Sequence, residues 1–352
     1  MPAAGRCDAK MRIAAFLLLL TFAAAFALAQ SSSQQAGLVK QGHQALDAND
    51  FQRAAQIFKE ARALAPDDQT VAEGLMLSYL QAKRLPDAIR LGHESVARWP
   101  QNAQLAHLLG IAFFQAHQNA EALRELTRAT KLSPRSFEIH FDLALVLLEM
   151  RQYALAAEQL TRAVRLKPGA AQAHVLLGRA CQNTNKTSAA LREFKTALRL
   201  DPQLPMVHYH LGFVYEGLGD TRQAIREYEA ETARGPANPE VLYRLGRAQM
   251  QAGSAVAGVQ NLRRAAQLDT TRAGIFYELG KAHNMLRQHR EAIDALQRAA
   301  ALDPKDPSPH YQLSRALLQT GDKTGAEREL QLFTELRKNQ PQTGGMASGR
   351  HQ

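Results

Sequence analysis

The sequence predicts an all-α superhelix, built as a stack of antiparallel helix hairpins. Proline recurs at steps of 34 residues, and a small residue recurs in a fixed phase with it. Alanine, leucine, glutamine and arginine dominate the composition, and all four lose little side-chain freedom in a helix. The runs of β-branched and aromatic residues that are typical of strands are missing from the sequence. A period of this length is the signature of hairpins that bury their apolar faces on one another.

The prolines mark the end of each repeat, because proline cannot continue the hydrogen-bond ladder of a helix. They stand at Pro66, Pro100, Pro134, Pro168, Pro202, Pro236 and Pro304, and Thr270 takes the one missing place. Counting from Gln35 gives nine repeats: 35–68, 69–102, 103–136, 137–170, 171–204, 205–238, 239–272, 273–306 and 307–340.

Two positions of the repeat stay small, which is what two closely crossing helices require. Position 20 is Ala54, Ala88, Ala122, Ala156, Ala190, Ala224, Gly258, Ala292 and Ala326. Position 8 is Gly42, Gly110, Gly178, Gly212, Gly246 and Gly280, with Met76, Ala144 and Ser314 as departures. Positions 7, 11 and 24 carry the larger apolar groups. Met76 and Gly92 in the second repeat, Glu231 in the sixth and Gly258 in the seventh depart from the pattern, and they predict looser packing in the second and seventh repeats.

Turn residues separate the two helices of a repeat. Asn49-Asp50, Gly219-Asp220, Gly253-Ser254 and Gly321-Asp322 are pairs that tolerate a left-handed backbone. Proline is also favoured in the first turn of a helix, where a missing amide proton costs nothing. We therefore expect Pro205, Pro239 and Pro307 to open the first helix of their repeats.

These features resemble the tetratricopeptide repeat family, with its Leu-Gly pair, its alanine twelve positions on and its proline at position 32. The resemblance covers residues 35–340 without an insertion. It implies a solenoid of helix hairpins that binds other proteins. The tryptophan common at position 4 in the family is absent, and histidine stands there in four repeats: His140, His174, His208 and His310.

The first 29 residues are typical of an export signal. Arg6, Lys10 and Arg12 precede an apolar stretch from Ile13 to Ala29, which ends in the small-x-small sequence that signal peptidases cleave. An uncleaved membrane anchor stays open as the alternative, although the stretch is short for a span. We expect an exported, periplasmic or secreted protein, with a polar leader at 30–34 and a disordered tail at 341–352.

The sequence predicts no catalytic site, metal site or cofactor. After cleavage Cys181 would be the one cysteine left, which cannot form an internal disulfide or a thiolate cluster. Equivalent histidines of successive repeats lie too far apart to share one ion, so we interpret the four at position 4 as structural. No metalloprotease, phosphate-loop or nucleophile-elbow motif occurs.

The resemblance implies that positions 2, 5, 6, 9, 12 and 13 of each first helix line a concave groove. In repeats two to four these positions carry apolar residues: Leu77, Leu80, Ile111, Phe114, Phe141, Leu145 and Leu148. In repeats five to nine they carry tyrosines and cations. The candidate partner-binding residues are Arg179, Tyr209, Phe213, Tyr243, Arg244, Arg247, Tyr277, Lys281, Tyr311 and Arg315.

Two interpretations of this basic, tyrosine-rich half stay open. It binds an extended acidic peptide through charge-assisted hydrogen bonds and ring contacts, or it is ordinary solvated surface. The net charge of +10 and the pI near 9.7 permit an anionic partner without pointing to a site.

The leading functional hypothesis is a non-catalytic scaffold of the bacterial-type cell envelope, with other proteins or extended peptides as partners. The alternative is a binder of an anionic polymer such as a polysaccharide. We do not expect a small-molecule substrate or nucleic acid, and we expect membrane contact only through an uncleaved signal segment.

Overall fold

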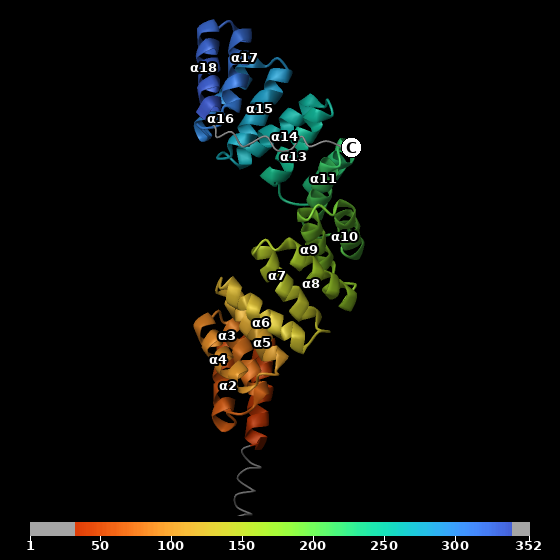
Figure 1. The fold of residues 1–352 in the computed structure, drawn as a ribbon, viewed down its shortest axis with the longest axis vertical. Coiled ribbons are helices and arrows are strands. Elements are labelled where there is room, and N and C mark those ends of the chain that lie inside the picture. Colours follow the sequence, from red (N-terminus) through yellow and green to blue (C-terminus); the bar gives the residue numbers. More distant parts are fainter. Residues whose placement is uncertain (1–31, 340–352) are drawn as a thin grey trace, which may run out of the picture. The chain divides into compact units, whose positions relative to one another are not determined.

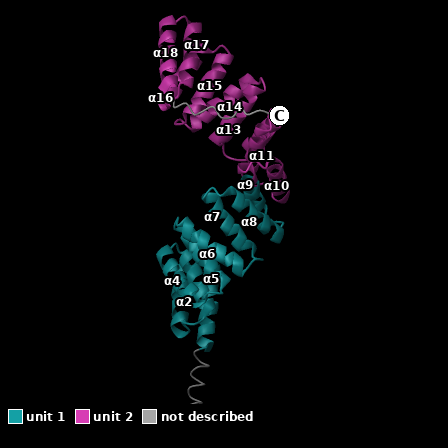
Figure 2. Ribbon diagram, viewed as in Figure 1, with its two compact units in different colours: residues 1–180 teal, residues 181–352 magenta. Residues whose placement is uncertain are grey.

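A computed structural model of the chain describes residues 32–339, and no strand occurs in that range, so the predicted all-α class is confirmed. The expected signal segment at 1–29 and the expected tail at 341–352 lie outside the described residues. Two compact units divide the chain at residue 180, and Figure 2 colours them separately. We call them the N-terminal compact unit and the C-terminal compact unit and describe each by itself.

The N-terminal compact unit holds the first helices of the chain, in red to green in Figure 1. After a helix over residues 32–47 come α2 (Phe51–Leu64), α3 (Gln69–Gln81), α4 (Leu85–Arg98), α5 (Ala103–Gln115), α6 (Asn119–Leu132), α7 (Phe137–Glu149) and α8 (Tyr153–Leu166). The division between the units falls within α9 (Ala171–Asn183).

The C-terminal compact unit continues the same alternation of first and second helices. It comprises α10 (Thr187–Leu200), α11 (Val207–Gly217), α12 (Thr221–Thr232), α13 (Pro239–Gln251), α14 (Ala255–Leu268), α15 (Ala273–Met285), α16 (His289–Leu302), α17 (Ser308–Thr320) and α18 (Lys323–Asn339). From α11 to α18, each first helix packs against the second helix of its own repeat, and each second helix from α10 to α16 packs against the next first helix.

The first described helix starts earlier than the sequence suggested. It covers residues 32–47, so residues 32–34 of the expected polar leader are helical. The repeat pattern places the first boundary at Gln35, because the pattern arises from residues that pack between helices. The first turn of the first helix packs against no preceding helix, so the pattern does not show where that helix begins.

In the first, third, sixth, seventh and eighth repeats the hairpin closes through contact between the glycine at position 8 and the large residue at position 24. A Cβ added to Gly212 would lie 2.6 Å from Cε1 of Tyr228, and one added to Gly246 would lie 2.7 Å from Cγ of Leu262. Tyr228 and Leu262 are fully buried. The glycines therefore leave the space that these side chains fill.

The second repeat reverses this arrangement. Its large residue is Met76 at position 8, which is fully buried, and its small residue is Gly92 at position 24. A Cβ on Gly92 would lie 2.7 Å from Cδ1 of Leu109 in the next repeat and 2.9 Å from Cε of Met76. The two departures compensate each other, so the looser packing expected in this repeat is not found there.

The backbone turns in the same way in all described repeats. The residue at position 15 has a positive φ of 57–90° throughout: Asn49, Lys83, His117, Arg151, Asn185, Gly219, Gly253, Arg287 and Gly321. The left-handed conformation costs a residue with a Cβ about 1–2 kcal/mol. The repeats with lysine, arginine or histidine at this position therefore carry a strain that the sequence pattern did not indicate.

The expected proline starts hold in part. Pro239 is the first residue of α13, as predicted, and Pro307 caps α17 one residue ahead of its start. The prediction that Pro205 opens a helix is wrong, since α11 begins at Val207 and the preceding Met206 is left-handed, with φ of 64°.

The carboxylate of Glu231 supports this shifted start. The backbone amide of Met206 donates to Oε1 at 2.8 Å, and that of Tyr209 lies 3.4 Å from Oε2. Amides at a helix start lack partners within the helix and favour a negative charge. Glutamate at position 27 thus has a capping role in the sixth repeat.

Three of the four histidines at position 4 form hydrogen bonds to the second helix of their own repeat. Their Nδ1 atoms contact the residue 19 positions later, as in His140 to Gln159 Oε1 at 2.8 Å and His208 to Glu227 Oε2 at 2.7 Å. His310 makes the same contact with Glu329 at 2.6 Å. These rings hold the two helices together, in agreement with a structural role.

The last described hairpin has an outer face that no further hairpin covers within residues 32–339. Leu330, at position 24 of the ninth repeat, is 47% exposed, whereas Leu296 at the same position of the eighth repeat is fully buried. Position 24 is therefore buried partly by its own hairpin and partly by the next one.

The compensation in the second repeat predicts a non-additive mutant cycle. Met76→Ala leaves a cavity and should cost about 2–5 kcal/mol of unfolding free energy. Gly92→Leu alone overpacks the hairpin and should cost about 1–3 kcal/mol. The double variant should be more stable than the sum of the two losses by about 1 kcal/mol or more, measured by urea unfolding. Simple additivity would show that the two side chains do not share one space.

Candidate functional site

The candidate residues of the C-terminal compact unit lie on its first helices. We call the residues at positions 2, 5, 6, 9, 12 and 13 of α11, α13, α15 and α17 the A-helix surface. It holds Tyr209 and Phe213 on α11, Tyr243, Arg244 and Arg247 on α13, Tyr277 and Lys281 on α15, and Tyr311 and Arg315 on α17. All nine side chains are partly or largely exposed.

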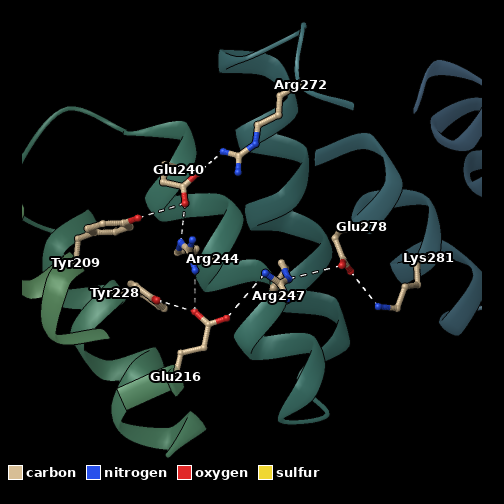
Figure 3. A network of polar contacts seen from close by, with 9 residues as sticks. All are labelled: Tyr209, Glu216, Tyr228, Glu240, Arg244, Arg247, Arg272, Glu278 and Lys281. Atoms are coloured by element: carbon tan, nitrogen blue, oxygen red, sulfur yellow. Dashed lines mark hydrogen bonds and ion pairs between the residues drawn. The ribbon is translucent and has the colours of Figure 1, made fainter. Parts of the chain in front are cut away.

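Glu216 on α11 links the sixth repeat to the seventh (Figure 3). Its Oε2 accepts hydrogen bonds from Nη1 of Arg244 at 3.2 Å and from the hydroxyl of Tyr228 at 2.8 Å. Its Oε1 lies 3.9 Å from Nη1 of Arg247. One carboxylate thus contacts two guanidinium groups of α13.

Glu240, in the first turn of α13, gathers a second set of contacts. Its Oε1 accepts from Nε of Arg244 at 2.6 Å and from the Tyr209 hydroxyl at 3.3 Å. Its Oε2 forms an ion pair with Arg272, which precedes α15 (Figure 3). Arg244 is therefore held from both sides, by Glu216 and by Glu240.

Glu278 on α15 extends the chain of contacts to the eighth repeat. Its Oε1 lies 3.6 Å from Nε of Arg247, and its Oε2 accepts from Nζ of Lys281 at 3.1 Å. Figure 3 shows the resulting line from Glu216 through Arg247 to Lys281. The four cations and three carboxylates form one continuous network.

Aromatic rings support the same cations. The guanidinium carbon of Arg244 lies 4.4 Å from the ring centroid of Phe213, and that of Arg272 lies 4.5 Å from the centroid of Tyr243. Arg247 also lies over Tyr243, at 5.5 Å. Such contacts contribute about 0.5–1 kcal/mol each at exposed sites. Rings and cations thus hold one another in fixed positions.

Burial and ion pairing shift the pKa values within the network. Burial raises the pKa of Glu240, but hydrogen bonds from Arg272 and Arg244 outweigh it, so that the pKa is lowered from 4.5. Burial, and then the charge of Glu216, raise the pKa of the Tyr228 hydroxyl. At neutral pH the glutamate is charged and the tyrosine is a hydrogen-bond donor, as the network requires.

The sequence-based list of candidate residues omitted the acidic half of this network. Glu216, Glu240 and Glu278 stand at positions 12, 2 and 6 of the first helices, which are positions expected to face the groove. Applying those positions to acidic side chains as well as to tyrosines and cations would have found them. The surface is consequently less basic than a count of arginine and lysine suggests.

Phe213, Tyr243 and Tyr277 contact the network through their rings, and three other candidate residues lie outside it. Tyr311 is 43% exposed and its ring packs against Phe333 of α18, with centroids 5.4 Å apart. Arg315 is exposed and lines a cleft next to α15 and α16. Arg179 is exposed on α9 within the N-terminal compact unit, so it is not part of the A-helix surface.

The N-terminal compact unit has an apolar counterpart on α3, α5 and α7. Six of the seven expected side chains are half-buried: Leu77, Ile111, Phe114, Phe141, Leu145 and Leu148. Leu80 is only 2% exposed, so its expected place in the lining is wrong. Position 12 lies at the border between the buried and open faces of the helix, and Phe114 at the same position is partly open.

Within residues 32–339, no group of three or more His, Cys, Asp or Glu side chains is arranged to hold a metal ion. In the same range, no helix combines the length and the apolar character that a membrane span needs.

The lowered pKa of Glu240 predicts how its contribution to stability depends on pH. A carboxylate whose pKa is lower in the folded state stabilises the fold above its unfolded pKa of 4.5. This contribution is lost as the pH falls through the folded pKa. Glu240→Gln should therefore lower the urea midpoint clearly near pH 7, and the difference from wild type should shrink near pH 3.

The control for this measurement is Glu291→Gln, at an exposed glutamate in the first turn of α16. Its effect should be small at each pH. A Glu240→Gln deficit as large near pH 3 as near pH 7 would contradict a role for the ionised carboxylate.

Comparison with known proteins agrees with this architecture. Sequence profiles of the tetratricopeptide repeat match residues 39–103, 107–149, 141–205 and 209–273, and a further one matches 285–343, so that together they span most of the chain. No curated protein matches the sequence.

Solved structures share the fold at low sequence identity. The chain is similar to the APC/C hetero-tetramer Cut9-Hcn1, at 18% identity and a TM-score of 0.52 over 76% of this chain and 52% of that one. It is also similar to pilF of Pseudomonas aeruginosa, at 19% sequence identity and a TM-score of 0.50, over 58% of this chain and 93% of that one. A third similar structure is YrrB, a TPR protein with an unusual peptide-binding site, at 19% sequence identity and a TM-score of 0.49, over 52% of this chain and 95% of that one. These likenesses concern the fold alone, and on the sequence profiles the chain belongs to the tetratricopeptide repeat family.

Proposed function

We propose that the chain is a non-catalytic scaffold that binds an extended segment of a protein partner on the A-helix surface of its C-terminal compact unit. The observation that carries this proposal is the row of partly exposed rings, Tyr209, Phe213, Tyr243 and Tyr277, on successive first helices. Tyrosine offers a large contact area at a low cost in conformational entropy, which favours recognition of another chain.

The network of ion pairs that contacts these rings supports the proposal. Arg244 and Arg247 are held by carboxylates of neighbouring repeats and by aromatic faces. Their side chains are therefore ordered before a partner arrives, and binding loses less entropy than it would with mobile side chains. A preformed surface of rings and polar groups favours a peptide that has both apolar and polar side chains.

The charge balance bears on the acidic partner expected from the sequence. Arg244, Arg247, Arg272 and Lys281 face Glu216, Glu240 and Glu278, so the network carries one positive charge in excess. An acidic ligand would have to compete with carboxylates already in place. The middle of the surface therefore favours apolar and neutral polar contacts.

The same balance counts against the alternative of an anionic polymer. Polymer binding relies on many cations that release counterions, and it weakens steeply as salt rises. Here the cations of α13 and α15 already have carboxylate partners within the protein. The affinity for a peptide should therefore fall less steeply with salt than the affinity for an anionic polymer would.

We also propose that the protein is exported and works in the periplasm or outside the cell, with a retained membrane anchor as the alternative. This rests on the sequence of residues 1–29 alone, with its basic start and apolar stretch. A mature chain that begins at Gln30 would support export with cleavage, and a retained Met1 would favour the anchor.

The peptide proposal is tested by selection from a phage-displayed library of short random peptides on the purified full chain. A selected peptide should bind Tyr243→Ala/Tyr277→Ala at least about tenfold more weakly in fluorescence anisotropy, because central aromatic contacts carry much of the binding energy. Tyr153→Ala on α8, in the other compact unit, is the control and should bind as wild type does. Failure to select any peptide, or equal affinity for both variants, would refute the proposal.

A further inference from the structure

A cleft of about 490 Å³ lies at the turn end of α15 and α17 in the C-terminal compact unit. It is lined by Asn284 and Met285 at the end of α15, Arg287 in the turn, His289 at the start of α16, and Arg315 and Leu318 on α17. We call it the terminal cleft. Arg315, at position 9 of its repeat, belongs to the A-helix surface as well, so the cleft continues that surface.

The terminal cleft differs from the network in its charge. No carboxylate is among its lining residues. Within residues 32–339, Arg287 and Arg315 form no ion pair, whereas Arg244 and Arg247 each contact two glutamates. The two guanidinium groups therefore give the cleft a positive charge that is not neutralised by the surrounding side chains.

Hydrogen bonds fix the polar wall of the cleft. Nδ2 of Asn284 donates to the backbone carbonyl of Gln312 on α17 at 3.1 Å, and Nδ1 of His289 lies 3.5 Å from Oδ1 of Asn284. The asparagine thus links α15 to both α16 and α17. The cleft keeps its shape because three helices are joined at its wall.

The apolar part of the cleft is open. Met285 is 58% exposed and Leu318 is 54% exposed, among the most exposed large apolar side chains of the described residues. Both line the same cleft as the two arginines. A ligand complementary to this cleft carries a negative group for the two arginines and, next to it, an apolar group for Met285 and Leu318.

We propose that the terminal cleft binds an aspartate or glutamate side chain of the partner peptide, with the adjoining apolar residue on Met285 and Leu318. Guanidinium groups bind carboxylates through strong, charge-assisted hydrogen bonds, often in pairs. The acidic preference expected from the sequence is thereby placed at Arg287 and Arg315 and not at Arg244 and Arg247. This inference rests on the proposed function, since it names the residue type that anchors the same peptide.

The test compares peptide selection from the random phage library on the wild-type chain and on Arg287→Gln/Arg315→Gln. Wild type should enrich peptides with Asp or Glu next to Leu, Ile, Met or Phe. The variant should still enrich apolar and aromatic residues and lose the acidic one. The control is Arg222→Gln/Arg226→Gln, which removes the same charge from exposed arginines of α12 and should select like wild type.

Affinities of one selected peptide sharpen the comparison. Replacing its acidic residue by the matching amide should weaken binding to wild type about tenfold, as expected for loss of a charge-assisted hydrogen bond. The same replacement should leave the affinity of Arg287→Gln/Arg315→Gln unchanged. Circular dichroism of each variant checks that it is folded.

The outcomes separate this inference from the proposed function. Peptides selected without an acidic residue, or with an acidic residue that the variant still selects, would overturn the inference and leave peptide binding in place. Loss of acidic selection in the Arg222→Gln/Arg226→Gln control would also overturn it, because net charge and not the cleft would then be responsible. Selection of no peptide at all would overturn both.

Discussion

The contact between a small residue at position 8 and a large one at position 24 is the constraint on which the rest of the structure depends. Gly246 against Leu262 and Gly212 against Tyr228 bring the two helices of a hairpin together at distances that a Cβ would prevent. Because this contact recurs every 34 residues, each repeat presents the same positions of its first helix on the same side. Met76 and Gly92 show that the pair must fill one space, and that either helix can supply the large residue.

The network on the A-helix surface follows from that regularity. Arg247 is 31 residues from both Glu216 and Glu278, and it contacts both, because one repeat of spacing brings equivalent faces side by side. Each of these pairs is partly exposed, and a single such pair contributes little to stability. Together these contacts order the arginine side chain, because an arginine bound to two glutamates and a ring has few other conformations available.

The fold was predictable from the sequence because its signal is periodic. A period of 34 residues identifies three kinds of position: the prolines, the small residues at positions 8 and 20, and the structural histidines. The compensation of Met76 by Gly92 was visible only as two departures, since a period cannot show that two side chains meet. The capping of α11 by Glu231 was hidden for the same reason.

The candidate site was predictable in its aromatic and basic residues and not in its charge balance. A position in the repeat tells which face a residue occupies. It does not tell which long side chain of the next repeat reaches it, as Arg244 reaches Glu216. For the same reason position 9 of the repeat does not distinguish Arg247 from Arg315, although the structure pairs the first with glutamates and leaves the second on an open cleft.

Arg244 and Arg247 are central to this description, because each is bound to a glutamate of a neighbouring repeat in the free protein. Nuclear magnetic resonance of the arginine Nε–H groups measures this directly. We expect separate, slowly exchanging signals for Arg244 and Arg247, with the Arg244 signal displaced by Glu216→Gln and the Arg247 signal by Glu278→Gln. Signals at the positions of solvated arginine that neither substitution moves would contradict it.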